Sequence, residues 1–542
     1  MLFNSYPFLF VYLPITFLGT FLIGAYSHRL AILWLGSASV VFYGFWNITF
    51  VSLLLGSIII NFEFGRRLSS AYQKKTSSNR ILALAIAANL LVLGYFKYCN
   101  FFIGSFAQLF GAEFAPFNII LPLGISFFTF TQIGFLIDVS RGLTSEASLS
   151  RYLLFVTYFP HLIAGPLLHH KDMMPQSADR GTFNFNIKNI SIGLTIFVLA
   201  LAKKIFLADS FSEIADPIFS AVEQGRQPLF FEAWIGALSY ALQLYFDFSA
   251  YSEMAIGLSL IFNIRLPLNF NSPFKATCVI EFWQRWHMSL TKYIYEYLYS
   301  PITLKFMRLG LGKSTLIENL YTILIPTFIT FLIIGLWHGA AWTFVTFGAL
   351  HGTYMVINYG WQAVKKKMRW KPTGLFYSLF CCALTYCCVV SALVFFRADS
   401  MSAALSILTG MVGLNGLSLP VTLQPFLNAL PFNLSKFTLV FDGLIPLSSF
   451  TPNPLVAVFL LVIGHAIVWL MPNMPQIMSS YEIALGYIVQ TKKRLLDERQ
   501  WMFRHALWRL TSFRAFSLGL LFFLIVIAMA TDKPSTFLYY QF

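Results

Sequence analysis

Residues 320–350 read LYTILIPTFITFLIIGLWHGAAWTFVTFGAL, a stretch without a single Asp, Glu, Lys or Arg. The stretch joins two apolar runs, residues 316–337 and 340–359. A helix needs about 20 apolar residues to cross a hydrocarbon core ~30 Å thick, so each run predicts a membrane-spanning helix. His338 stands at the junction between the two runs.

The rest of the chain has the same character. Of its 542 residues, 57% are hydrophobic and 11% are charged, against about 25% charged in an average soluble domain. This composition excludes a soluble globular protein and a disordered chain, and six cysteines are too few for a disulfide scaffold. We therefore expect an all-α, polytopic integral membrane protein.

Similar apolar runs predict about 11–13 transmembrane helices, together with re-entrant or interfacial helices. The runs lie near residues 7–26, 30–45, 48–62, 81–98, 118–138, 150–168, 186–207, 229–262 (with a possible break), 316–337, 340–359, 376–396, 454–472 and 515–531. We expect one membrane-embedded domain over residues 1–542, divided into N-terminal helices (7–115), a core (118–400), an extracytoplasmic loop (401–453) and C-terminal helices (454–542).

Basic clusters predict the orientation, because Lys and Arg concentrate at the cytoplasmic ends of spans. The clusters at residues 66–80, 365–371 and 492–514 should be cytoplasmic, which puts the N-terminus outside. A bacterial cytoplasmic (inner) membrane is the expected location. The net charge of +15 fits this topology and contact with anionic membrane lipid rather than with nucleic acid, and binding of an anionic donor is the alternative.

His338 is the first candidate catalytic residue. Gly339 permits close backbone approach, and Trp337 and Trp342 flank the histidine. A buried imidazole between aromatic walls suits general base chemistry, while a structural, hydrogen-bonded histidine explains the local pattern equally well. His351, about one helix further on, is interpreted as a packing residue.

The block EFWQRWHMSLTK, residues 281–292, mixes charged groups with Trp283 and Trp286. Such a mixture is typical of an interfacial or re-entrant helix, expected here on the cytoplasmic side. Arg285 and His287 belong to this block, so His287 and His338 should approach the membrane interior from different ends.

Two further features place polar groups in apolar sequence. Asp247 and Glu253 lie in YFDFSAYSEM, residues 245–254, and need partners inside a membrane. They either pair with Arg285 or Lys292 or orient a catalytic histidine. Residues 160–166, PHLIAGP, break a predicted span in mid-run, which is tolerated where the backbone is buried or lines a cavity.

These blocks together resemble the membrane-bound O-acyltransferase (MBOAT) family, in particular the bacterial branch that contains the membrane subunit of alginate O-acetylation. The resemblance rests on the ordered occurrence of residues 121–127, 159–166, 247–257, 282–290, 337–352 and 395–400. It implies the MBOAT fold, with His338 as the catalytic histidine and His287 as the second histidine. It also implies a tunnel between a cytoplasmic donor side and an outer acceptor side.

The expected function is O-acetyl transfer from a cytoplasmic thioester, such as acetyl-CoA, to an exported polysaccharide or to an extracytoplasmic SGNH-like acyltransferase. No bound cofactor or metal is expected. The alternatives are a lipid, protein or D-alanyl acyltransferase of the same superfamily and, in another class, a transporter or flippase that uses the two histidines as a proton path.

Overall fold

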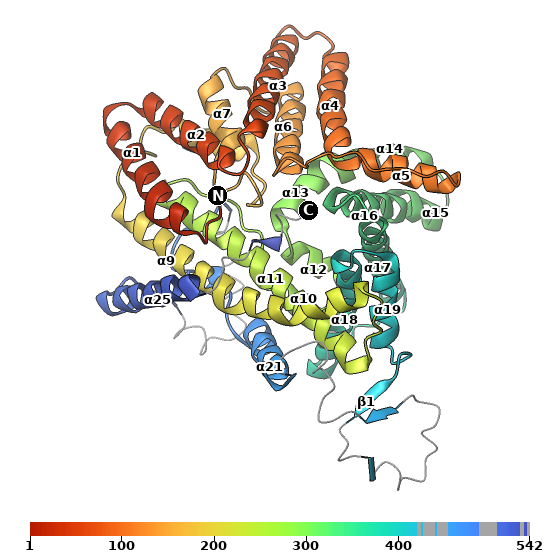
Figure 1. Cartoon of the computed structure of the whole chain (residues 1–542). Coiled ribbons are helices and arrows are strands. Elements are labelled where there is room, and N and C mark those ends of the chain that lie inside the picture. Colours follow the sequence, from red (N-terminus) through yellow and green to blue (C-terminus); the bar gives the residue numbers. More distant parts are fainter. Residues whose placement is uncertain (420–423, 426–438, 442–453, 487–506, 532–535, 539–542) are drawn as a thin grey trace.

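The computed structural model describes residues 1–419, 424–425, 439–441, 454–486, 507–531 and 536–538 (Figure 1). In these ranges the chain is built from helices, apart from β1 (Leu417–Leu419) and β2 (Leu439–Phe441), which pair in parallel. The predicted all-α membrane fold is therefore confirmed. Most of the predicted extracytoplasmic loop 401–453 lies outside the described residues, as does most of the basic cluster at 492–514.

Along the chain, a first group of helices precedes residue 230 and a second group follows it. The first group comprises α1 (Leu13–Tyr26), α2 (His28–Gly44), α3 (Thr49–Gln73), α4 (Asn79–Leu93), α5 (Cys99–Leu109), α6 (Ile125–Ser140), α7 (Leu149–Thr157), α8 (His170–Ala178), α9 (Ile187–Lys203) and α10 (Asp209–Glu223). The second comprises α11 (Phe230–Ile261), α12 (Val279–Arg285), α13 (Met288–Ile294), α14 (Ser300–Gly310), α15 (Thr315–Asn319), α16 (Ile325–His338), α17 (Trp342–Lys367), α18 (Leu375–Arg397), α19 (Met401–Met411), α21 (Pro454–Leu470), α22 (Met474–Ile477) and α25 (Ser512–Thr531).

Single π-helical turns continue several helices without a break. They lie at Phe8–Tyr12, Gly94–Tyr98, Lys204–Ala208, Tyr295–Tyr299 and Leu320–Leu324. Such turns shift the side chains that follow around the helix axis and are frequent at functional sites. Here they carry Lys97, Lys204, Glu296 and Tyr297, all of which take part in the polar contacts described below.

Helix α11 runs through the middle of the molecule (Figure 1), and nearly all its side chains are buried. It crosses α9 closely, because Gly193 and Gly257 face each other; a Cβ at Gly257 would lie only 2.6 Å from the Gly193 oxygen. One hydrophobic core packs the C-terminal half of α11 against the N-terminal helices, and a second packs its N-terminal half against α16 to α19. The aromatic side chains around His338, such as Trp337 and Phe396, belong to the second core.

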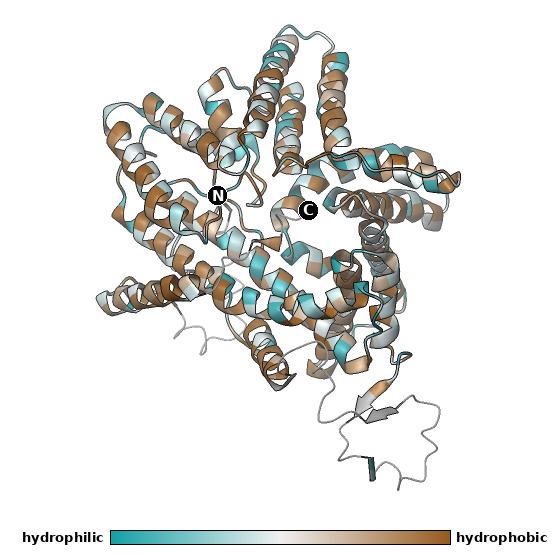
Figure 2. Ribbon diagram, viewed as in Figure 1, coloured by the Kyte–Doolittle hydropathy of each residue, from teal (hydrophilic) through white to brown (hydrophobic). Residues whose placement is uncertain are grey.

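Seven helical segments of the described chain are long and apolar enough to cross a membrane, and three shorter helices are also apolar. Figure 2 shows the predominantly hydrophobic colouring of outlying helices such as α25 and α21. These numbers fall short of the predicted 11–13. One reason is α11, which carries Glu232, Asp247 and Glu253 and is shielded by protein. The possible break predicted in residues 229–262 is absent.

The predicted span 150–168 is wrong as a single helix. Helix α7 ends at Thr157, and residues 158–169 are not helical. These residues are nevertheless buried, and His161 Nε2 lies 3.0 Å from the Phe155 oxygen. The predicted break at residues 160–166 is confirmed, and its polar backbone lies inside the protein as membrane burial requires.

Candidate active site

His338 is the last residue of α16, where the helix ends because Gly339 adopts an extended conformation. Close crossing of α16 and α17 fixes this end: a Cβ at Gly335 would lie 2.9 Å from Gly348 Cα, so only glycine lets the two backbones approach. The His338 side chain is 7% exposed. Its ring centroid lies 4.9 Å from that of Trp337 and 5.1 Å from that of Phe396.

The predicted neighbours of His338 do not all share its site. Trp337 is buried in the same wall, and Gly339 packs so closely on the Phe344 ring that a Cβ would overlap it. Trp342 is 54% exposed and its indole donates a hydrogen bond to Ser105 Oγ, 3.2 Å away. The extended residues after His338 thus direct the Trp342 indole toward α5, and its predicted supporting role stays a prediction.

Lys97 is the residue that the sequence interpretation missed. From the π-helical turn after α4, its Nζ donates to the Trp337 oxygen at 2.6 Å and to the His338 oxygen at 3.1 Å, and it lies 3.4 Å from Ser126 Oγ. A cation that binds the last carbonyls of a helix is favoured by the helix dipole. The available signal was one lysine inside the apolar run 81–98, since ionisable residues in spans are functional candidates.

His351 forms the layer behind His338. The Phe347 ring lies between the two, with centroid distances of 6.0 Å to His338 and 4.6 Å to His351. Trp283 Nε1 donates to His351 Nδ1 at 3.2 Å. Trp283 is thus joined to His351 by a hydrogen bond, and its predicted supporting role stays a prediction. The interpretation of His351 as a packing residue is consistent with these contacts.

His287 lies at a break between two short helices. The predicted continuous helix over residues 281–292 is wrong, because α12 ends at Arg285 and α13 begins at Met288. His287 itself has φ +44°, a left-handed conformation that is strained for a residue with a side chain and is often found at functional sites. Its buried ring lies 4.8 Å from that of Phe248.

The predicted partners of Asp247 and Glu253 are wrong. Asp247 accepts from Lys204 Nζ at 2.7 Å and from the Leu538 N–H at 2.9 Å. Glu253 accepts from Lys203 Nζ at 2.7 Å. Two adjacent lysines where α9 meets its π-helical turn thus neutralise the two carboxylates of α11. Among the described residues, the hydrogen bonds of both carboxylates go to lysines or to backbone, and no direct bond to a histidine is among them.

Arg285 does not take its predicted partner, and the predicted supporting roles of Arg285 and Trp286 stay predictions. Arg285 pairs with Glu281 at 2.6 Å, one helical turn away. Although burial opposes it, the Thr277 N–H bond and the Arg285 charge together lower the pKa of Glu281. Trp286 stacks on Phe282, with 5.6 Å between ring centroids. Both residues stabilise the α12 region, and Arg285 is not a partner of Asp247 or Glu253.

The site therefore consists of a buried imidazole at a helix end, an aromatic enclosure and a lysine Nζ that donates to the adjacent carbonyls. An enclosed neutral imidazole can remove a proton from a hydroxyl or accept an acyl group. In the part of the chain that the structure describes, no group of three or more His, Cys, Asp or Glu side chains could hold a metal ion. These features define a multi-pass membrane protein with a histidine enclosed in its interior.

The chain belongs to the MBOAT family, membrane-bound O-acyltransferases, whose model matches residues 45–366. It is 39% identical over 471 residues to a peptidoglycan O-acetyltransferase of Helicobacter pylori, covering 81% of this chain and 86% of that protein. It is 38% identical over 409 residues to the "Probable alginate O-acetylase AlgI" of Azotobacter vinelandii, covering 74% and 76%. The expected family resemblance is confirmed, and the chain is a membrane O-acyltransferase.

A more distant relative is named for the transfer of a different acyl group, D-alanine. The chain is 29% identical over 245 residues to a teichoic acid D-alanyltransferase of Streptococcus thermophilus, covering 45% of this chain and 58% of that protein. The two relatives named for O-acetyl transfer match a much longer part of the chain.

Proposed function

We propose that this chain passes an acetyl group from a cytoplasmic acyl thioester, such as acetyl-CoA, across the bacterial inner membrane to an exported glycan. The receiving group is either a glycan hydroxyl or a hydroxyl of an extracytoplasmic SGNH-like acyltransferase. The observation that carries the proposal is His338, buried at the end of α16 with its backbone held by Lys97. An imidazole so enclosed is shielded from water that would hydrolyse a thioester.

In the proposed reaction, His338 takes the proton of the acceptor hydroxyl. The oxygen then attacks the thioester carbonyl, the carbon–sulfur bond breaks, and the departing thiolate takes the proton from His338 as a new ester forms. In the alternative course, the acyl group passes first to the imidazole and then to the hydroxyl. General base catalysis of this kind contributes about 10²- to 10⁴-fold in rate.

Two glycans are the leading acceptors, because the relatives are named for peptidoglycan and for alginate. We place peptidoglycan first, since that relative matches 81% of this chain. A lipid or protein acceptor is the alternative within the superfamily, and a transporter is the alternative in another class.

Turnover of acetyl-CoA by the purified protein separates these possibilities. We expect thioester cleavage that is stimulated by peptidoglycan fragments, with the acetyl group recovered as an ester on the glycan. Alginate oligosaccharides and a lipid extract serve as matched acceptors. If none of these acceptors received the acetyl group while the protein moved a solute across vesicles, the transporter interpretation would replace this one.

The orientation of the chain is a separate prediction. Lys74 and Lys366 are exposed and belong to basic clusters, which are expected to be cytoplasmic. Cysteines are placed at these positions in a variant that lacks the six native cysteines. They should react with a membrane-impermeant thiol reagent only when the reagent has access to the cytoplasm. A cysteine at position 430, which lies outside the described residues, should react from the outside. Reaction of position 74 in intact cells with an impermeant reagent would reverse the model and the direction of transfer.

A further inference from the structure

The bend that carries His287 is braced by the irregular segment between α11 and α12. Before the bend, the Asn271 N–H donates to the Arg285 oxygen at 2.9 Å. After the bend, the Met288 N–H donates to the Asn269 oxygen, also at 2.9 Å. Backbone bonds to one segment therefore lie on both sides of His287 and set the direction of the chain there.

The side chain of Asn269 adds a second set of bonds, and it is buried. Its Oδ1 accepts from Ser289 Oγ at 2.6 Å and from the Ser289 N–H at 3.3 Å. Its Nδ2 donates to Ser252 Oγ of α11 at 3.0 Å. Both polar atoms of a buried amide are thus satisfied, as burial requires. Through these bonds Asn269 joins the first turn of α13, directly after His287, to α11.

The bonded face of α11 is also the face that contacts the His287 ring. Ser252 lies four residues after Phe248 on α11, so their side chains project from the same side of the helix. The Phe248 ring meets the His287 imidazole edge-on, with 4.8 Å between ring centroids and an interplanar angle of 85°. Asn269 therefore holds α13 on the surface against which the imidazole packs. A shift of α13 would move the imidazole relative to that surface.

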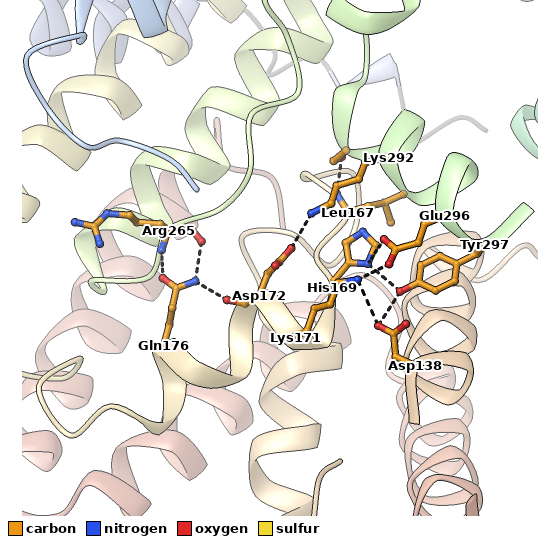
Figure 3. A network of polar contacts seen from close by, with 11 residues as sticks. Asp138, Leu167, His169, Lys171, Asp172, Gln176, Arg265, Lys292, Glu296 and Tyr297 are labelled. Atoms are coloured by element: carbon orange, nitrogen blue, oxygen red, sulfur yellow. Dashed lines mark hydrogen bonds and ion pairs between the residues drawn. The ribbon is translucent and has the colours of Figure 1, made fainter. Parts of the chain in front are cut away.

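Other polar contacts hold the rest of α13 (Figure 3). The Leu167 N–H donates to Ser289 Oγ at 2.9 Å, so the same hydroxyl accepts from Leu167 and donates to Asn269. The helix and its π-helical turn are also tied to α6 and to the start of α8: Lys292 pairs with Asp172, Glu296 with Lys171, and Tyr297 with Asp138 and His169. These contacts fix the body of the helix, whereas Asn269 binds the residues next to His287.

The backbone of His287 indicates what this bracing is for. Its φ of +44° and ψ of +52° belong to the left-handed region, which glycine adopts without strain. A glycine would form the same bend more easily, so the bend alone does not explain an imidazole at this position. Strained residues persist where the surrounding structure fixes them, and they cluster at functional sites. The bonds of Asn269 provide that fixation.

We infer that Asn269 is a positioning residue for acetyl transfer, because it fixes the place of the His287 imidazole. The inference rests on the proposed function and on the expected part of His287 as its second histidine. The side-chain bonds of Asn269 go to Ser289 and Ser252, so it acts through His287 and not on the reacting groups.

A purely structural asparagine would behave differently. If Asn269 only stabilises the fold, its loss adds to the effect of any other change. If it acts through His287, its effect on transfer disappears once the imidazole is absent. A double-mutant cycle separates the two roles.

The cycle uses purified full-length protein with acetyl-CoA and peptidoglycan fragments, and kcat is expressed per folded molecule. We expect Asn269→Ala to lower kcat about tenfold with the KM for acetyl-CoA within about twofold, since a displacement of about 1 Å at a reacting group can cost 10²-fold. His287→Ala should lower kcat about 10²-fold. The double variant should match His287→Ala within about twofold. Losses that multiply to about 10³-fold, or a change in KM alone, would overturn the inference.

Ser252→Ala tests the same bond with a smaller change, should Asn269→Ala fail to fold. It removes the hydroxyl that accepts from Asn269 Nδ2 and leaves the asparagine in place. We expect kcat to fall about threefold in the wild-type background and to stay unchanged when His287→Ala is already present. The same threefold loss in both backgrounds would contradict positioning through His287.

Asn263→Ala is the matched control, because Asn263 lies in the same irregular segment. Its side chain also forms three hydrogen bonds, to Asn189, Thr182 and Asn184, and none of these partners belongs to α12 or α13. It should lower the thermal unfolding temperature and keep kcat within about twofold of wild type. A tenfold loss of kcat in this control would assign the Asn269→Ala effect to lost stability and overturn the inference. Absence of acetyl transfer by the wild type would instead contradict the proposed function.

Discussion

Replacing His338 by alanine should reduce acetyl transfer by about 10³-fold or more while the protein remains folded and inserted. The imidazole is the group at the buried end of α16 that can take a hydroxyl proton, and loss of a general base costs about 10²- to 10⁴-fold. Removal of the imidazole leaves a small void between Trp337 and Phe396. We therefore expect a modest decrease in the thermal unfolding temperature. Transfer is measured as acetyl ester formed on the glycan.

His465→Ala provides the control for this experiment. His465 is also a histidine in an apolar helix, hydrogen-bonded to Tyr386 and 2.7 Å from the Leu461 oxygen, but it belongs to α21. Its loss should lower stability without abolishing transfer. If His338→Ala retained more than a tenth of wild-type activity, His338 could not be the essential base, and the proposed mechanism would fail.

Features that depend on local sequence could be predicted. Long apolar runs specify helices because a membrane requires every backbone group to be bonded internally. The break at residues 160–166 follows from two prolines, and the end of α16 after His338 follows from Gly339. The family resemblance was predicted from ordered blocks, and the family model confirms it.

Features that depend on pairing distant segments could not be predicted. Asp247 was expected to bind Arg285 or Lys292, yet α9 passes close to α11 and brings Lys204 to it instead. Arg285 instead forms an ion pair with Glu281 of the same helix, because side chains four residues apart lie next to each other on a helix surface. The sequence offers several cations for each buried carboxylate, and only the crossing of helices selects one.

The break at His287 illustrates another limit. The sequence EFWQRWHMSLTK, residues 281–292, contains neither Pro nor Gly, so its periodicity favours one helix. The break is instead fixed from outside, because the Met288 N–H donates to the Asn269 oxygen and Ser289 Oγ donates to Asn269 Oδ1. Tertiary hydrogen bonds thus override local helix propensity and hold His287 in a left-handed conformation.

Replacing Lys97 by methionine should lower kcat for acetyl transfer by about 10²-fold with little change in donor KM. Methionine keeps much of the volume and removes the three hydrogen-bond donors of the ammonium group. The Trp337 and His338 carbonyls then lose their partner, and the end of α16 is free to shift. A displacement of about 1 Å at a reacting group can cost 10²-fold in rate.

Tyr98→Phe is the matched control for Lys97→Met. Tyr98 OH donates to the Leu336 oxygen at 3.1 Å, so its removal frees the preceding carbonyl of the same helix end without changing any charge. We expect Tyr98→Phe to lower kcat less than threefold and Lys97→Arg to restore part of the activity lost in Lys97→Met, because arginine supplies both charge and donors. Wild-type kcat in Lys97→Met would show that His338 is positioned without the lysine. An equal loss in Tyr98→Phe would assign the effect to tethering of α16 alone, since Lys97 and its hydrogen bonds are retained in that variant.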